Sequence, residues 1–402
     1  MMKKSLLIVM MLLLTIFSLV GCTNEGNEQK TYYHVYSNKI ESLEYVAMLT
    51  GVNAYENTQE KWDIGGTDLG FPYYDSTRGQ MYFLFGDTFH GINTGDGNWR
   101  SQVIGISTDL DASDGIEFDS FISNDKKGWA TQIIPALHDP NDAEGERTTI
   151  PTGGIAINGV HYVFYMSVRE WFEIGWAVNF CGLAKSTDGK NFTVSKDIFW
   201  AEDDTIGQIN AASILNVNSD NIGGHVSQNF LQVFPYQVGE YVYLFGITNG
   251  RSGGCKLARV LTTDIEDFSK YEYYTGKDFD SNPIWVKGTE GLKKIKNNDD
   301  SYILEPQVGE LSVSYNKYLG KYVMSFYSLD RIVMSFSDDL INWSNVEVLI
   351  SSNDLIIPYG GFSHEYYMEQ DGKVMYFFIS QYYEQSLGDN GYNVKIVKCT
   401  FK

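Results

Sequence analysis

An aromatic-rich strand pattern that recurs five times constrains the fold of this chain more than any other feature. Each copy reads as a strand, a turn and a second strand, and four copies then reach a Ser/Thr-Asp turn, at residues 108, 187, 263 and 337, which are intervals of 79, 76 and 74 residues. Such regular recurrence indicates a repeat architecture in which each copy is one structural unit. The aromatic strands are 81–85, 161–165, 241–245, 322–326 and 374–378.

A repeat of roughly 75 residues fits one four-stranded blade with long loops. Five copies therefore predict an all-β protein, a five-bladed β-propeller, with four or six blades as alternatives if one copy is miscounted. The 28 Tyr, 23 Phe and 39 Gly beside only 8 Pro favour strands joined by tight turns. We expect the last strand, near 394–401, to pair with N-terminal strands and close the ring.

The N-terminus has the form of a secretory leader. Two lysines precede an apolar run from Leu6 to Val20, which is short for a membrane-spanning helix of roughly 20 residues. Gly21 before Cys22 resembles the lipobox of bacterial lipoproteins, and this resemblance implies that Cys22 carries the lipid. The alternative is an ordinary leader that ends on a cysteine by chance.

These features divide the chain into a signal peptide (1–22), a polar tether and lead-in (23–44) and the propeller (45–402). We expect an extracytoplasmic protein, anchored to the bacterial cell membrane through its N-terminal lipid only, and monomeric. The remaining cysteines, at positions 181, 255 and 399, are odd in number and form no C-x-x-C pair. They are therefore expected to be buried free thiols.

The charge of the chain bears on its partners. A net charge of −21 argues against nucleic acid, because binding a phosphate backbone needs clustered Lys and Arg. A neutral or cationic polymer is the better electrostatic partner, although the same acidity can simply keep a surface protein soluble.

Two aspartates are the leading catalytic candidates, because the chain has no Gly-x-Ser-x-Gly elbow, Walker loop, His-Glu-x-x-His or Rossmann glycines. Asp68 and Asp87 lie symmetrically about a turn at 77–78, so hairpin pairing would place them opposite each other with Cβ atoms about 5 Å apart. Repulsion would then keep one carboxyl protonated, and glycoside hydrolysis needs an acid beside a carboxylate. A β-bulge between them would break this register. The alternative is that Asp68 binds backbone and Asp87 starts a loop.

Other candidates are weaker. Glu310 begins the fourth repeat, where an inner strand would point it into the central funnel; a structural role for Glu310 is equally compatible with the sequence. Glu305 precedes a proline and could be a turn residue. Aromatic faces stack on sugars and Arg or His side chains bind hydroxyls, which makes substrate-contact candidates of Trp99, Arg100, Trp171, Trp176, Arg251 and His364. We expect no cofactor and no catalytic metal, while a structural Ca²⁺ in the channel stays open.

Two turns, 186–192 and 337–343, look like the Asp-box hairpins of sialidases and related propellers. There the Asp caps the turn and the aromatic residue packs between blades. We therefore expect a structural role for both turns and no chemistry.

Several motifs in order resemble a bacterial family first catalogued as a domain of unknown function and now associated with five-bladed endo-D-arabinanases. The resemblance covers nearly all of 46–401, and its motifs are 66–70 (GTDLG), 85–89 (FGDTF), 99–101 (WRS), 250–254 (GRSGG), 308–312 (VGELS) and 359–362 (YGGF). It implies an endo-acting hydrolase of α-D-arabinofuranosyl linkages with Asp68 and Asp87 as the catalytic pair. Fold transfers more safely than activity.

Three functions are compatible with these observations. The first is a surface glycoside hydrolase in which Glu310 assists the two aspartates, acting on D-arabinan, another furanoside or a host or neighbour polysaccharide. The second is a glycan-binding surface lipoprotein that does not cut its ligand. A sialidase-like exo-enzyme is disfavoured, because the sequence has no obvious arginine triad for a carboxylated sugar.

Overall fold

The computed structural model describes residues 30–138, 145–173, 175–305, 307–382 and 391–402. The lipobox with Cys22 lies outside these residues, so lipid attachment stays a prediction. Among the described residues, no helix combines the length and the apolar character that a membrane crossing requires.

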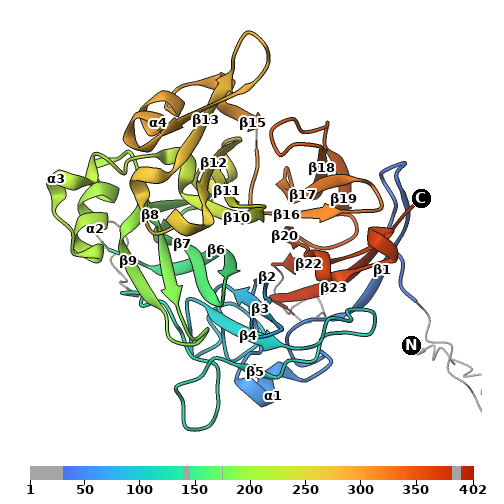
Figure 1. Ribbon diagram of the computed structural model, residues 1–402. Coiled ribbons are helices and arrows are strands. Elements are labelled where there is room, and N and C mark those ends of the chain that lie inside the picture. Colours follow the sequence, from blue (N-terminus) through green and yellow to red (C-terminus); the bar gives the residue numbers. More distant parts are fainter. Residues whose placement is uncertain (1–29, 139–144, 174, 306, 383–390) are drawn as a thin grey trace, which may run out of the picture. The chain divides into compact units, whose positions relative to one another are not determined.

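Five antiparallel sheets arranged as the blades of a propeller make up the unit from Thr31 to Lys402 (Figure 1). The first blade contains β2 (Leu69–Asp75), β3 (Gln80–Phe85), β4 (Val103–Ser107) and β5 (Ser120–Phe121). The second contains β6 (Thr148–Ile157), β7 (Val160–Trp171), β8 (Trp176–Ser186) and β9 (Thr193–Ala201). The third contains β10 (Gln232–Val238), β11 (Tyr241–Ile247), β12 (Cys255–Leu261), β13 (Glu272–Lys277) and β14 (Pro283–Lys287), and β15 (Tyr302–Leu304) pairs with β12.

The last two blades complete the ring. The fourth contains β16 (Leu311–Asn316), β17 (Lys321–Ser328), β18 (Arg331–Ser337) and β19 (Glu347–Ser351). The fifth contains β20 (Pro358–Phe362), β21 (Met368–Glu369), β22 (Val374–Gln381), β23 (Asn393–Phe401) and β1 (Ile40–Met48). Four α-helices lie between strands in the described segments: α1 (Thr58–Trp62), α2 (Thr205–Leu215), α3 (Ser219–Ile222) and α4 (Gly288–Ile295).

The predicted five-bladed propeller is confirmed. The five aromatic strands of the repeat correspond to β3, β7, β11, β17 and β22, and each has the inner strand of its sheet on one side. Ring closure is confirmed as well, because β1 pairs antiparallel with β23 and supplies the outermost strand of the fifth blade. β1 begins at Ile40, before residue 45 where the propeller was expected to start, and its Ile40 and Leu43 side chains are buried in a core that the fourth and fifth blades share.

The centre of the ring is filled by apolar side chains from the inner strands. One core cluster includes Phe71 of β2, Ile150 of β6, Phe234 of β10, Leu311 of β16 and Phe362 of β20. The rings of Phe71 and Phe362 lie 3.8 Å apart between centroids. This packing leaves the ends of the inner strands as the places where polar side chains can gather.

Both predicted Asp-box turns are structural. Asp188 Oδ1 accepts from the backbone N–H groups of Lys190 and Asn191 at 2.8 Å each. In the second box the capping residue is Asp339, not the neighbouring Asp338, and its Oδ1 accepts from Asn342 N–H at 2.8 Å. The three cysteines expected to be buried free thiols are confirmed as such.

Candidate active site

A cavity of about 740 Å³ opens where the inner strands begin. Its size is within the range of small-molecule sites. Asp68 directly precedes β2, Glu310 directly precedes β16, and Tyr359 belongs to the first residues of β20, so blades distant in sequence contribute to one wall. The wall includes Asp68, Asp87, Trp99, His138, Arg147, Trp171, Phe172, Trp176, Gln232, Arg251, Glu310, Ile357, Tyr359, Tyr382 and Tyr392.

Asp68 and Asp87 share this cavity, but not as the cross-strand pair that the turn symmetry predicted. The predicted register holds from Asp75↔Gln80 to Phe71↔Leu84 and is then shifted by a bulge, after which Leu69 pairs with Phe85. The Gly86 N–H donates to the Asp68 carbonyl at 3.2 Å, so Asp68 lies opposite Gly86. The bulge arises because Leu69 and Gly70 are both left-handed, with φ of 63° and 89°.

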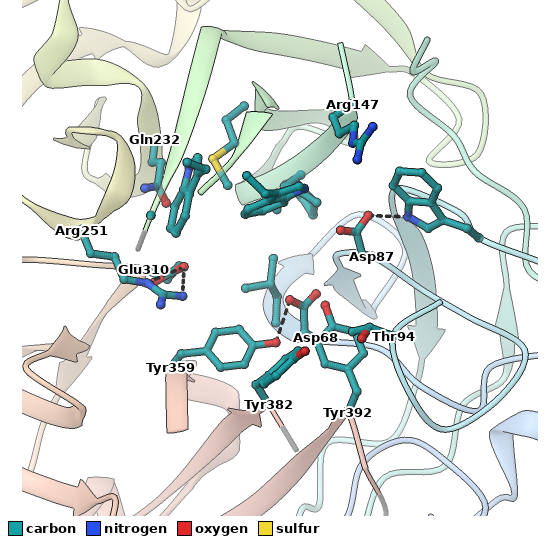
Figure 2. A pocket seen from close by; sticks show the side chains of 18 of the residues that line it. Asp68, Asp87, Thr94, Arg147, Gln232, Arg251, Glu310, Tyr359, Tyr382 and Tyr392 are labelled. Carbon is teal, nitrogen blue, oxygen red and sulfur yellow. Dashed lines mark hydrogen bonds and ion pairs between the residues drawn. The ribbon is translucent and has the colours of Figure 1, made fainter. Parts of the chain in front are cut away.

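The Asp68 carboxyl is held by a tyrosine from another blade. Tyr359 Oη donates to Asp68 Oδ2 at 2.8 Å (Figure 2). Asp68 Oδ1 is buried and accepts no well-formed hydrogen bond from the described residues, although the Tyr392 side chain is near enough to the carboxyl to lower the Asp68 pKa. A Cβ atom on Gly86 would lie 2.2 Å from Asp68 Oδ1, so any side chain at this position would force the Asp68 carboxyl to shift.

The Asp87 carboxyl is held through a single oxygen. Trp99 Nε1 donates to Asp87 Oδ1 at 2.7 Å, and Thr148 Oγ1 donates to the same atom at 2.8 Å. Figure 2 shows Asp87 and Asp68 at the same cavity, with the dashed bond on one oxygen of Asp87. Oδ1 is therefore fixed by two donors, while neither of these bonds engages Oδ2.

Burial dominates the electrostatics of both aspartates. It raises the pKa of Asp68 to about 7, with the charge of Asp87 adding to the increase. It raises the pKa of Asp87 to about 6, against the hydrogen bonds from Trp99 and Thr148, which lower that pKa. Near neutral pH the pair therefore combines a carboxylic acid with a carboxylate, and Asp68 is the group that keeps its proton to higher pH.

Glu310 lies in the cavity as predicted, but as half of an ion pair. Arg251 donates to it with two nitrogens, Nε to Oε2 at 2.8 Å and Nη2 to Oε1 at 2.7 Å. The guanidinium lies 4.5 Å from the ring centre of Tyr327 and 5.3 Å from that of Tyr359. Both groups are largely engaged with each other, so Glu310 acts on Asp68 through its charge, which raises the Asp68 pKa slightly.

Arg100 is not part of the cavity wall, which corrects its assignment as a substrate contact. It is buried, and its Nη1 donates to Asp63 Oδ2 at 2.9 Å while Nη2 donates to the Asp63 carbonyl at 2.6 Å. Asn98 also donates to Asp63 Oδ2. Because Asn98 and Arg100 flank Trp99, Asp63 fixes the segment from which the Trp99 indole reaches Asp87.

The other sequence candidates divide between the cavity and the remainder of the molecule. Trp171 and Trp176 line the cavity and pair with each other at the adjoining ends of β7 and β8. His364 does not line it: it caps a short 3₁₀ turn after β20, at the opposite end of that inner strand, where Nδ1 accepts from Tyr366 N–H at 3.2 Å. Glu305 is exposed and outside the cavity.

Sequence reasoning missed the residues that hold the aspartates. Tyr359 and Thr148 come from different blades, and nothing near Thr148 in sequence marks it as a partner of Asp87. For Tyr359 a signal existed, because it begins the 359–362 motif on which the resemblance rests. In the described parts of the chain, no group of three His, Cys, Asp or Glu residues could hold a metal ion.

Comparison with known proteins decides the family. Residues 53–398 match the family described as a domain of unknown function, DUF4185. The chain belongs to this family. Among curated proteins, this DUF4185 member is 28% identical over 316 residues to notoamide biosynthesis cluster protein J' of Aspergillus versicolor, covering 76% of the chain and 77% of that protein.

Solved structures resemble the DUF4185 protein in fold. A protein of Bacteroides ovatus ATCC 8483, solved as a candidate hydrolase, superimposes with a TM-score of 0.54 at 12% identity over 89% of this chain and 90% of its own. A family 117 glycoside hydrolase of Zobellia galactanivorans gives a TM-score of 0.45 at 11% identity, again over 89% and 90%. Likeness at this level of identity concerns the fold alone.

Proposed function

We propose that this DUF4185 member is a glycoside hydrolase that uses Asp68 as the general acid and Asp87 as its carboxylate partner. One observation carries the proposal: two carboxyls line one cavity, and their surroundings raise their pKa values to about 7 and about 6. Unequal carboxyls are what this reaction needs, because one must donate a proton to the leaving oxygen while the other is ionised.

The surroundings suit these roles. Tyr359 donates to one oxygen of Asp68. Because the pKa of Asp68 is raised to about 7, Asp68 keeps its proton at pH values at which Asp87 is ionised. Trp99 and Thr148 hold Asp87 Oδ1, which leaves Oδ2 to act as base or nucleophile. Aromatic side chains around the cavity offer apolar faces for sugar rings.

We propose further that the substrate is an arabinofuranosyl polysaccharide of the D-arabinan type and that the enzyme acts outside the cytoplasm, anchored through Cys22. Support for the substrate comes from the motifs shared with the endo-D-arabinanase family, two of which contain Asp68 and Asp87. Support for the location comes from the apolar leader and the lipobox-like Gly21-Cys22.

Reducing-end release from arabinogalactan tests the enzyme assignment. We expect the wild type to release reducing ends and the Asp68→Asn and Asp87→Asn variants to lose at least about 1,000-fold of that activity, because each removes one of two essential groups. Asp338→Asn, at an exposed carboxylate that caps no turn, is the control and should keep full activity. Equal release by all four proteins would refute the catalytic pair, and tight binding without any release would favour the glycan-binding alternative.

A further inference from the structure

Three residues that line the cavity each carry a buried polar atom without a hydrogen-bond partner among the described residues. Besides Asp68 Oδ1, these are Trp176 Nε1 and His138 Nδ1. Buried polar atoms in folded proteins are nearly always paired, so an unpaired atom on a cavity wall points to a ligand group that completes it. Trp176 and His138 come from β8 and from the segment before β6, and they specify two separate points of contact.

Trp176 can contact a ligand mainly through its indole N–H. Only 7% of the residue is exposed, so little ring surface is left for a sugar to stack on. The Arg251 guanidinium lies 5.1 Å from the ring centre, and the Trp171 ring lies 5.5 Å away. An indole N–H is a donor and never an acceptor. The ligand atom at this point must therefore be an acceptor.

His138 offers the ligand a hydrogen-bond acceptor, in contrast to the donor of Trp176. Its Nε2 lies 3.1 Å from Gln132 Oε1, and the same oxygen accepts from the Ser101 N–H at 2.8 Å, which identifies it as the amide oxygen. Nε2 therefore carries the hydrogen. Burial lowers the pKa of His138, so the ring is neutral near pH 7 and Nδ1 is a bare acceptor. The ligand group at this point must be a donor.

We propose that the cavity binds an uncharged sugar through two hydroxyl groups, one accepting from Trp176 Nε1 and the other donating to His138 Nδ1. The inference rests on the proposed function for the bond that is cut, and it adds the two side chains, Trp176 and His138, that recognise hydroxyl groups of the sugar. A hydroxyl both donates and accepts, whereas a carboxylate only accepts and cannot satisfy His138.

The charges of the cavity agree with a neutral ligand. Two arginines, Arg147 and Arg251, line it together with three carboxyls, and the Arg251 charge is matched by the two-pronged contact with Glu310. Figure 2 shows this pair on the wall that also carries Gln232. The wall therefore offers no excess of positive charge for a uronic or sialic acid.

Binding measurements with deoxy sugars test the proposal. The probe is a D-arabinofuranosyl oligosaccharide together with its singly deoxygenated analogues, titrated calorimetrically into full-length Asp87→Asn protein, which keeps the side-chain shape but does not turn the probe over. Adding Trp176→Phe should weaken binding of the parent probe about tenfold, the value of one lost hydrogen bond. The loss should vanish for the single analogue that lacks the partner hydroxyl.

His138 allows a sharper pair of variants. His138→Asn keeps a polar group near the Nδ1 position and suits the left-handed backbone there, where φ is 51°, so binding should stay within about threefold. His138→Gln moves the amide towards the Nε2 position and should weaken binding about tenfold, except for the analogue that lacks the second hydroxyl. Trp343→Phe, whose indole donates to the Leu340 carbonyl at 2.9 Å away from the cavity, should leave binding unchanged.

Two results would overturn the proposal. One is that Trp176→Phe and His138→Gln weaken all analogues equally or not at all, with thermal midpoints showing that both variants fold. The other is that a uronic-acid oligosaccharide binds more tightly than the neutral probe. If the variants lose affinity for all probes except the matching deoxy analogue, but wild-type protein releases no reducing ends, the hydrolase assignment fails and the recognition of a neutral sugar stands. If wild-type protein releases reducing ends but the variants show no such selectivity, the hydrolase assignment stands and the proposed recognition fails.

Discussion

At the scale of single residues, the two aspartates receive different hydrogen bonds. Asp68 accepts from the phenol of Tyr359 and is also influenced by that of Tyr392, whereas Asp87 accepts from Trp99 and Thr148 on one oxygen. Burial raises both pKa values, and the two donors to Asp87 offset part of its increase. This difference in surroundings is the basis on which we propose Asp68 as the acid and Asp87 as its partner, since two carboxyls in equal surroundings would share the roles.

The pH dependence of kcat/KM follows from these pKa values. Activity should fall below about pH 6, where Asp87 becomes protonated, and above about pH 7, where Asp68 loses its proton, which gives a narrow bell. A pH–rate profile on soluble arabinan checks this. Activity that stays flat from pH 4 to pH 6 would show that Asp87 is not the ionised partner.

Trp99→Phe and Tyr359→Phe should move opposite limbs of that bell. Each hydrogen bond stabilises the ionised carboxylate that accepts it and so lowers its pKa. Losing the Trp99 donor should raise the Asp87 pKa and shift the acidic limb to higher pH, with kcat falling about tenfold. Losing the Tyr359 donor should raise the Asp68 pKa and shift the alkaline limb upwards. Shifts of both limbs in both variants would contradict the separate assignments.

At the scale of elements, the hairpin of β2 and β3 decides where the carboxyls point. The bulge at Leu69 and Gly70 places Asp68 opposite Gly86. Asp87 therefore follows the end of β3 without Asp68 as its cross-strand partner. A regular ladder would have set two carboxyls directly across from each other, a destabilising arrangement. The bulge brings both to one cavity while each keeps separate hydrogen-bond partners.

Gly86→Ala tests this geometry. A methyl group there would lie 2.2 Å from Asp68 Oδ1, so the carboxyl must move, and misplacement by about 1 Å costs on the order of 100-fold in rate. We expect kcat to fall by that factor with a small change in the thermal midpoint. Gly223→Ala, where a Cβ meets nothing within 4 Å, is the matched control. Unchanged kcat in Gly86→Ala would mean that Asp68 does not need its observed position.

At the scale of the whole propeller, the ring is closed by a strand from the other end of the chain. β1 pairs with β23, and Leu43 of β1 is fully buried with Phe401 of β23 in the core between the fourth and fifth blades. The cavity depends on this closure, because Tyr359 reaches Asp68 from the fifth blade and Asp68 belongs to the first. An open ring would separate the acid from its tyrosine.

Leu43→Ala should therefore lower the free energy of unfolding by about 2–5 kcal/mol, the usual cost of a cavity in a packed core. Chemical denaturation measures it, with Glu41→Ala, an exposed neighbour on the same strand, as a control that should change stability by less than about 0.5 kcal/mol. A loss near zero at Leu43 would show that β1 is dispensable for closure.

The sequence by itself determined the number of blades and the closing strand, because strand periodicity and turn residues are local signals that repeat along the chain; it also named Asp68 and Asp87, which line one cavity. Only the tertiary structure decided where the Asp68 and Asp87 side chains lie. It also decided that Arg100 donates hydrogen bonds to Asp63 and that Glu310 forms an ion pair with Arg251. Those outcomes depend on a one-residue bulge and on contacts between blades tens to hundreds of residues apart. Side-chain pairing across a closed ring leaves no periodic trace in sequence, so the hydrogen bonds from Tyr359 and Thr148 to the two aspartates emerged only once the blades were assembled.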